Sequence, residues 1–104
     1  MTKQELPTVY FNGEVCTLRY SKYYMGKRVC IELVTLQGEP MCTCTLNAPY
    51  VPLCFDEVLI KDYSENGGVL YALVFAGVVE YIADEPLEHS LMVAKKCRLL
   101  VKPE

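Results

Sequence analysis

The six cysteines are the residues of this chain with the widest chemistry, because a thiolate can bind a metal ion or attack an electrophile. Cys42 and Cys44 are separated by one residue, so on a strand both sulfurs would point to one side. With Cys16 or Cys54 nearby, they could form part of a thiolate metal site. Structural zinc, however, normally uses paired cysteines held on turns, and a single Cys-x-Cys lacks that pattern. We therefore predict reduced thiols that fill the core, with no metal and no cofactor.

A nucleophilic Cys–His pair is the second chemistry that the residue types allow. The one histidine, His89, lies eight residues before Cys97 in a polar segment. No third group can be named that would orient the imidazole. We therefore predict no catalytic residue and no enzyme, and a small Cys–His enzyme remains an alternative.

Two adjacent glycines, Gly67 and Gly68, could form a phosphate-binding turn before a helix. A phosphate loop of the Walker type continues with a lysine and a hydroxyl residue, whereas Val69 follows here. The carboxylate of Asp62 would also repel an anion at this helix start. The glycines therefore indicate an ordinary helix start, with Ser64 as its predicted N-cap.

Tyrosine is unusually common, with eight residues and no tryptophan. Its ring is apolar and its hydroxyl is polar, a combination that suits a protein-binding surface. Tyrosines in turns and loops have little core to fill, and one aromatic pair lies four residues apart in the predicted helix. The predicted binding residues are Tyr50, Tyr63, Tyr23, Tyr24, Tyr71 and Phe75.

Charge and hydropathy argue against nucleic acid and membranes as partners. The net charge is −3, and the ten basic residues are scattered along the sequence. No apolar run is long enough to cross a bilayer, and the first ten residues contain no apolar signal segment. We therefore expect the protein to reside in the cytoplasm.

Residues 8–46 are predicted to form a four-stranded antiparallel meander, the scaffold that positions the first set of candidates. Asn12 and Gly13 supply the two positive-φ positions of a type I′ hairpin turn, and Gly26 and Gly38 mark two further turns. The third strand is apolar on most of both faces, which indicates a central position. In the fourth strand, alternation places Cys42, Cys44 and Leu46 inward and Met41, Thr43 and Thr45 outward.

The second half of the chain is predicted to add one helix and further strands. The predicted order begins with a loop over 47–52, a short strand or extended segment over 56–62 and a helix from Ser64 to about Ala76. A strand or extended segment over 78–84, a polar loop over 84–90 and a final strand over 91–101 follow. Gly77 would end the helix in a left-handed conformation. The helix is apolar nearly all round, so most of its circumference should be covered.

The fold prediction is a single α+β domain spanning residues 1–104. The chain length suits one domain, and 52% hydrophobic with 22% charged residues is a globular balance. A mostly antiparallel sheet of five or six strands, beginning with the meander, would pack on one main α-helix. One helix covers little of such a sheet, so a homodimer is an open alternative.

The second half also resembles a family of small bacterial proteins. The segments that carry the resemblance are Leu46-Asn47-Ala48-Pro49, DEVLIKDYSENGGVLYALVFAGVV and KKCRLL. They are similar to proteins catalogued as domain of unknown function 4313, which occur on plasmids, integrated conjugative elements and phages. The resemblance implies a mobile-element setting and implies no catalytic residue.

These observations favour a non-enzymatic protein-binding or accessory module. Its partner would be another protein or a second copy of the chain, met through a surface built from the tyrosines and the loop at 47–56. Inhibition of a host defence nuclease is an alternative that uses the same kind of surface.

Overall fold

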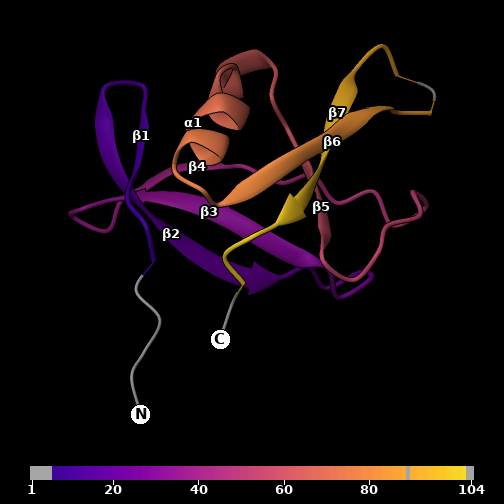
Figure 1. The fold of residues 1–104 in the computed structure, drawn as a ribbon, viewed down its shortest axis with the longest axis horizontal. Coiled ribbons are helices and arrows are strands. Elements are labelled where there is room, and N and C mark those ends of the chain that lie inside the picture. Colours follow the sequence, from indigo (N-terminus) through magenta and orange to yellow (C-terminus); the bar gives the residue numbers. More distant parts are fainter. Residues whose placement is uncertain (1–5, 89, 103–104) are drawn as a thin grey trace.

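The structure, a computed structural model, describes residues 6–88 and 90–102 as two antiparallel sheets and one α-helix (Figure 1). The first sheet has the order β1-β2-β3-β4 and consists of β1 (Val9–Phe11), β2 (Glu14–Lys22), β3 (Val29–Thr35) and β4 (Pro40–Thr43). The second has the order β5-β7-β6 and consists of β5 (Glu57–Ile60), β6 (Val79–Pro86) and β7 (Val93–Leu99). The α+β class is therefore confirmed. Among the described residues, no helix is both long and apolar enough to span a membrane.

The N-terminal meander forms as predicted. Asn12 and Gly13 have φ angles of 52° and 76°, the two left-handed positions of the expected hairpin turn. β3 lies between β2 and β4, and it buries Ile31 on one face and Val34 on the other. The double burial explains why its sequence lacks polar alternation.

The single sheet of five or six strands is wrong, because the described strands number seven and form two sheets. The chain bends after β4, where Thr45 makes only an isolated bridge to Ile60. The Cys44 N–H still donates to the Ile31 carbonyl at 2.8 Å, while the Lys61 N–H donates to the Cys44 carbonyl at 2.7 Å. Residues 44–46 are thus a corner that joins the sheets.

The outward orientation predicted for Thr45 is also wrong, since Thr45 is only 4% exposed. Its Oγ1 accepts the buried Ile31 N–H at 3.1 Å. A hydroxyl replaces a strand carbonyl at this point, which lets the backbone leave the β3 ladder without an unpaired donor.

The helical segment is divided into a 3₁₀ turn, η1 (Ser64–Asn66), and a short helix, α1 (Val69–Phe75). The Ser64 cap is therefore a wrong prediction: the Asp62 carboxylate accepts the N–H groups of Gly68 and Leu70 at 3.0 and 3.1 Å. Gly68, with φ of 94°, makes the break between the two helices. Gly77, with φ of 76°, follows α1 as predicted.

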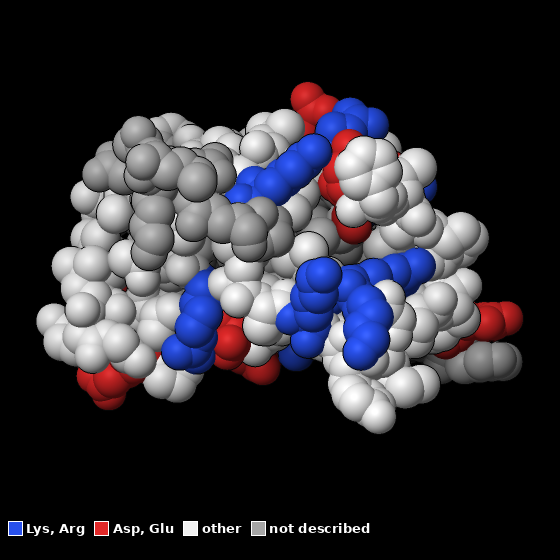
Figure 2. Space-filling view, turned by 90° about the horizontal axis from the view of Figure 1, so that it is seen from below, with Lys and Arg blue, Asp and Glu red and all other residues white. Residues whose placement is uncertain are grey.

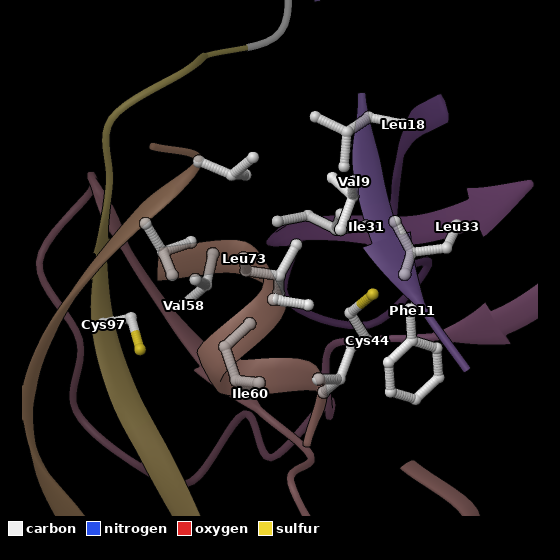
Figure 3. Close-up of a cluster of buried hydrophobic side chains, with 14 of the residues drawn as sticks. Val9, Phe11, Leu18, Ile31, Leu33, Cys44, Val58, Ile60, Leu73 and Cys97 are labelled. Atoms are coloured by element: carbon white, nitrogen blue, oxygen red, sulfur yellow. The ribbon is translucent and has the colours of Figure 1, made fainter. Parts of the chain in front are cut away.

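The core lies between the two sheets, with α1 inserted along one side (Figure 1). In Figure 3, Leu73 from α1 lies between Ile31 of the first sheet and Val58 of the second. α1 buries only this face, and Tyr71 and Phe75 remain 73% and 79% exposed. The prediction that most of the helix circumference is covered is therefore wrong.

The polar loop predicted over 84–90 is shorter than expected. Asp84, Glu85 and Pro86 belong to β6 and pair with Lys95, Ala94 and Val93 of β7. An ion pair between Lys95 Nζ and Asp84 Oδ1, at 2.8 Å, spans the two strands. Cross-strand partners therefore extend a strand that local polarity alone would end.

Candidate binding surfaces

The predicted aromatic pair of α1 forms one exposed surface. Tyr71 and Phe75 are four positions apart on one helix face, and their rings stack with centroids 6.0 Å apart and planes 19° apart. They face outward because Val69 and Leu73 turn the opposite side of α1 into the core. Tyr10 of β1, 70% exposed, lies across a groove from them.

We call this groove and its walls the helix–β1 surface. The groove has a volume of about 490 Å³ and is lined by Thr8, Tyr10, Tyr71, Ala72, Phe75 and Ala76. Aromatic residues and alanines make up most of this lining, so the groove suits an apolar side chain of a partner. A concentration of exposed aromatic area of this kind is characteristic of interaction sites.

Tyr24 and Tyr50 lie in a second region, where the β2–β3 turn meets the loop after residue 46. The Asn47 amide donates to the Met25 carbonyl at 3.1 Å, and the Arg28 guanidinium donates to the Ala48 carbonyl at 2.8 Å. These bonds hold turn and loop together. The tyrosines themselves are 87% and 60% exposed.

Tyr23 and Tyr63 are placed differently from the other four predicted residues. The Tyr23 hydroxyl donates to the Thr45 carbonyl at 3.1 Å and lies 2.9 Å from Thr45 Oγ1. Burial is the main cause that raises the pKa of Tyr23 to about 12. Tyr63 is half-buried, and the Lys61 ammonium lies 5.7 Å from its ring centroid. Tyr23 therefore supports the corner at Thr45, and the exposed aromatic area comes from the other residues.

Sequence reasoning missed two aromatic residues, Tyr10 and Phe55. Tyr10 could have been found, because strand alternation places it opposite the buried Val9 and Phe11. Phe55, 93% exposed, follows a loop whose course no local pattern describes.

The thiols are free, and their burial bears on reactivity. Cys16, Cys30, Cys44 and Cys97 are buried, Cys42 is half-buried and Cys54 is exposed. The prediction that the thiols fill the core is therefore wrong for Cys54, which lies in the loop before β5. Burial raises the pKa of Cys97 to about 12, which leaves little thiolate at neutral pH. Its suggested partner, His89, lies outside the described residues.

Cys42 and Cys44 form an asymmetric pair at the end of β4. A hydrogen bond between the side chains lowers the pKa of Cys42 and raises that of Cys44, whose burial raises it further. Within residues 6–88 and 90–102, no three His, Cys, Asp or Glu side chains are grouped so that they could hold a metal ion.

Comparisons with family models, curated proteins and solved structures found no match to this chain. The resemblance to domain of unknown function 4313 therefore stays a prediction.

Proposed function

We propose that the protein is a non-enzymatic protein-binding module that acts through the helix–β1 surface. The observation that carries this proposal is the stacked Tyr71–Phe75 pair, which leaves two large rings in water on the element that also builds the core. Exposed aromatic area of this size costs solvation free energy, and a partner that covers it recovers that free energy.

The partner is another protein or a second copy of this chain, and the setting is the cytoplasm. A role as an accessory of a mobile element rests on the family resemblance alone. The rival enzyme hypothesis needs a reactive thiol, and the burial of Cys97 weighs against it.

The test is an affinity capture from cells of the source organism, with the double variant Tyr71→Ala/Phe75→Ala as the decisive comparison. We expect the wild-type chain to retain a defined partner. The variant should capture at least about tenfold less of that partner, as when interface hot spots are removed. Light scattering of both proteins identifies the partner as a second copy if only the wild-type chain is dimeric.

The matched control is Tyr24→Ala/Tyr50→Ala, which removes two rings, 87% and 60% exposed, from the other region. It should retain the partner, and both double variants should keep the wild-type unfolding midpoint, because the rings are largely in water. The proposal fails if the α1 variant captures the partner as well as wild type, or if the native chain neither captures a partner nor self-associates.

Inhibition of a host defence nuclease is a narrower form of the same proposal. It predicts that expression of the chain raises survival of phage or plasmid DNA in a restricting host, and that the α1 double variant does not. Equal survival with and without the chain across several defence systems would remove this alternative.

A further inference from the structure

A second hollow, away from the helix–β1 surface, lies where the end of β2, the β2–β3 turn, the segment before β5 and the end of β7 meet. Its volume is about 480 Å³ and it is open to solvent on one side. We call it the basic hollow; its lining includes Lys22, Lys27, Arg28, Phe55 and Lys102. The volume falls within the range of small-molecule sites.

The charge of the basic hollow is opposite to that of the chain. Among the described residues, four basic and two acidic residues line it, whereas the whole sequence has ten basic and 13 acidic residues. Figure 2 shows several Lys and Arg side chains on one side of the molecule, with some Asp and Glu side chains beside them. The fold has thus concentrated cations that are dispersed in the sequence, and the local field favours an anion.

Both carboxylates of the lining already have partners. Asp56 Oδ2 lies 3.4 Å from Arg98 Nε, and Glu57 Oε1 accepts the Cys54 N–H at 2.8 Å. The Arg28 guanidinium is likewise engaged, since it donates to loop carbonyls. In the described part of the chain, the three lysines of the lining form no ion pair, so no carboxylate neutralises them. The Lys27 ammonium lies 5.4 Å from the ring centroid of Tyr24, outside the hollow, and would have to leave that ring to meet an anionic ligand.

The rest of the lining is apolar. Val29, Val58 and Leu99 contribute to it from β3, β5 and β7, and Leu53 contributes from the loop. Phe55 is 93% exposed at this site, and the Lys102 ammonium lies 5.4 Å from its ring centroid. A ring held in water beside a cation offers a flat face for stacking next to a charge that binds an anion.

We propose that the basic hollow binds a small organic phosphate, whose planar ring stacks on Phe55 while its phosphate meets Lys22, Lys27 and Lys102. The ligand combines the two chemistries of the lining: an anion for the lysines and a flat apolar body for the ring. This site is independent of the helix–β1 surface, so it can be present whether or not that surface binds a protein.

Calorimetric titration with adenosine monophosphate tests the proposal, with adenosine, inorganic phosphate and phenyl phosphate as comparison ligands. We expect saturable binding of the nucleotide with a Kd below about 1 mM. Adenosine and inorganic phosphate should each bind at least about fivefold more weakly, because each lacks one of the two groups. The stronger of the two ring-bearing phosphates indicates whether the natural ligand is a nucleotide or another aryl phosphate.

Variants locate the binding site. Phe55→Ala should weaken nucleotide binding by about fivefold or more, the loss expected when a stacking ring is removed, without changing phosphate binding. Lys27→Gln and Lys102→Gln should each weaken nucleotide binding by about threefold to fivefold. The control is Lys61→Gln. Lys61 lies outside the hollow, with its Nζ 3.9 Å from Glu65 Oε1, so this variant should bind the nucleotide as wild type does. All substituted positions are at the surface, and unchanged unfolding midpoints verify the fold.

Any one of several results would overturn the proposal. They are no saturable nucleotide binding at several times 1 mM, equal binding of nucleotide and inorganic phosphate, equal binding of nucleotide and adenosine, or wild-type affinity in both Phe55→Ala and Lys102→Gln. A single-stranded oligonucleotide that binds far more tightly than the mononucleotide would also overturn it, because the site would then recognise a polymer backbone.

Discussion

At the scale of single residues, Thr45 decides where the first sheet ends. It is buried, and its hydroxyl accepts the N–H of Ile31, which is itself fully buried. Tyr23 then bonds to the same threonine from the outer side. A polar residue inside an apolar corner is stable here because its hydroxyl and its carbonyl both have hydrogen-bond partners.

Thr45→Val is expected to lower the free energy of unfolding by about 1–3 kcal/mol, because the buried Ile31 N–H loses its acceptor while the side-chain volume is kept. Chemical denaturation measures the change. The matched control is Thr43→Val on β4, an exposed position, which should change stability by less than about 0.5 kcal/mol. Equal effects of the two substitutions would contradict the assigned role.

Tyr20 and Tyr23 make stability sensitive to alkaline pH. Burial raises the pKa of both from 10.0 to about 12. Below the unfolded-state pKa both states are protonated and stability is complete. As pH rises from 10 toward 12, the unfolded chain loses these protons while the folded chain keeps them, so the free energy of unfolding falls.

For Tyr23→Phe, the free energy of unfolding is therefore expected to fall less steeply as pH rises. The difference in slope corresponds to about one proton, because the variant lacks one of the two phenols. Denaturation midpoints measured at a series of pH values across this window give the slope. A free energy of unfolding that stays constant from pH 10 to pH 12 would contradict the burial of both phenols.

At the scale of elements, α1 depends on a residue outside the helix. The Asp62 carboxylate binds the N–H groups of Gly68 and Leu70 and so satisfies donors of the first turn. It also supplies negative charge at the positive end of the helix dipole. The same bonds occupy the position where a phosphate would bind, so the glycine pair is a structural turn.

Asp62→Ala should destabilise the protein by about 1 kcal/mol, the usual cost of losing an N-cap side chain. The control Glu65→Ala removes a charge of the same sign from the adjoining turn, where the side chain is 78% exposed, and should cost less than about 0.5 kcal/mol. Thermal denaturation distinguishes them. A larger loss for Ser64→Ala than for Asp62→Ala would restore the sequence-based prediction of the cap.

At the scale of the whole molecule, two sheets and a short helix share one core. The cluster that contains Leu73 includes residues of both sheets, and each of its buried residues exposes less than a tenth of its surface. The second sheet also packs Leu59 and Ala94 against Ala48 and Val51 of the loop. Its Val58 and Ile60, however, share one core cluster with residues of the first sheet, so each sheet depends on the other for this buried face. The two sheets should therefore unfold together.

Leu73→Ala is expected to cost about 2–5 kcal/mol, because it opens a cavity between Ile31 and Val58. Hydrogen exchange should show that β3 and β7 lose protection in parallel. Val74→Ala, at a neighbouring helix position that is 42% exposed, should cost less than about 1 kcal/mol. Loss of protection in one sheet alone would contradict a shared core.

Much of the local structure could be predicted from sequence because its causes lie within a few residues. Asn12-Gly13 dictates its turn, alternation places Leu18 inward, and Gly77 ends the helix. The Thr45 prediction failed because alternation assumes a straight strand, whereas the chain bends there. The Ser64 prediction failed because the cap comes from Asp62, two residues earlier, once the 3₁₀ turn has folded back.

The candidate surfaces were less accessible to prediction than the fold. The spacing of Tyr71 and Phe75 indicated a common helix face, but whether that face is buried depends on which side the two sheets leave open. The basic hollow was not predicted at all, since Lys22, Lys27 and Lys102 are far apart in the sequence and their gathering depends on how β2 and β7 end.

The sequence by itself determined the hairpins, the central position of β3, the thiol-rich interior and the α+β class, because backbone preference and side-chain alternation act over short distances. Only the tertiary structure decided the division into two sheets, the exposed side of α1 and the collection of positive charge in one hollow. These features depend on contacts between residues distant in the chain, whose free energy no local pattern encodes.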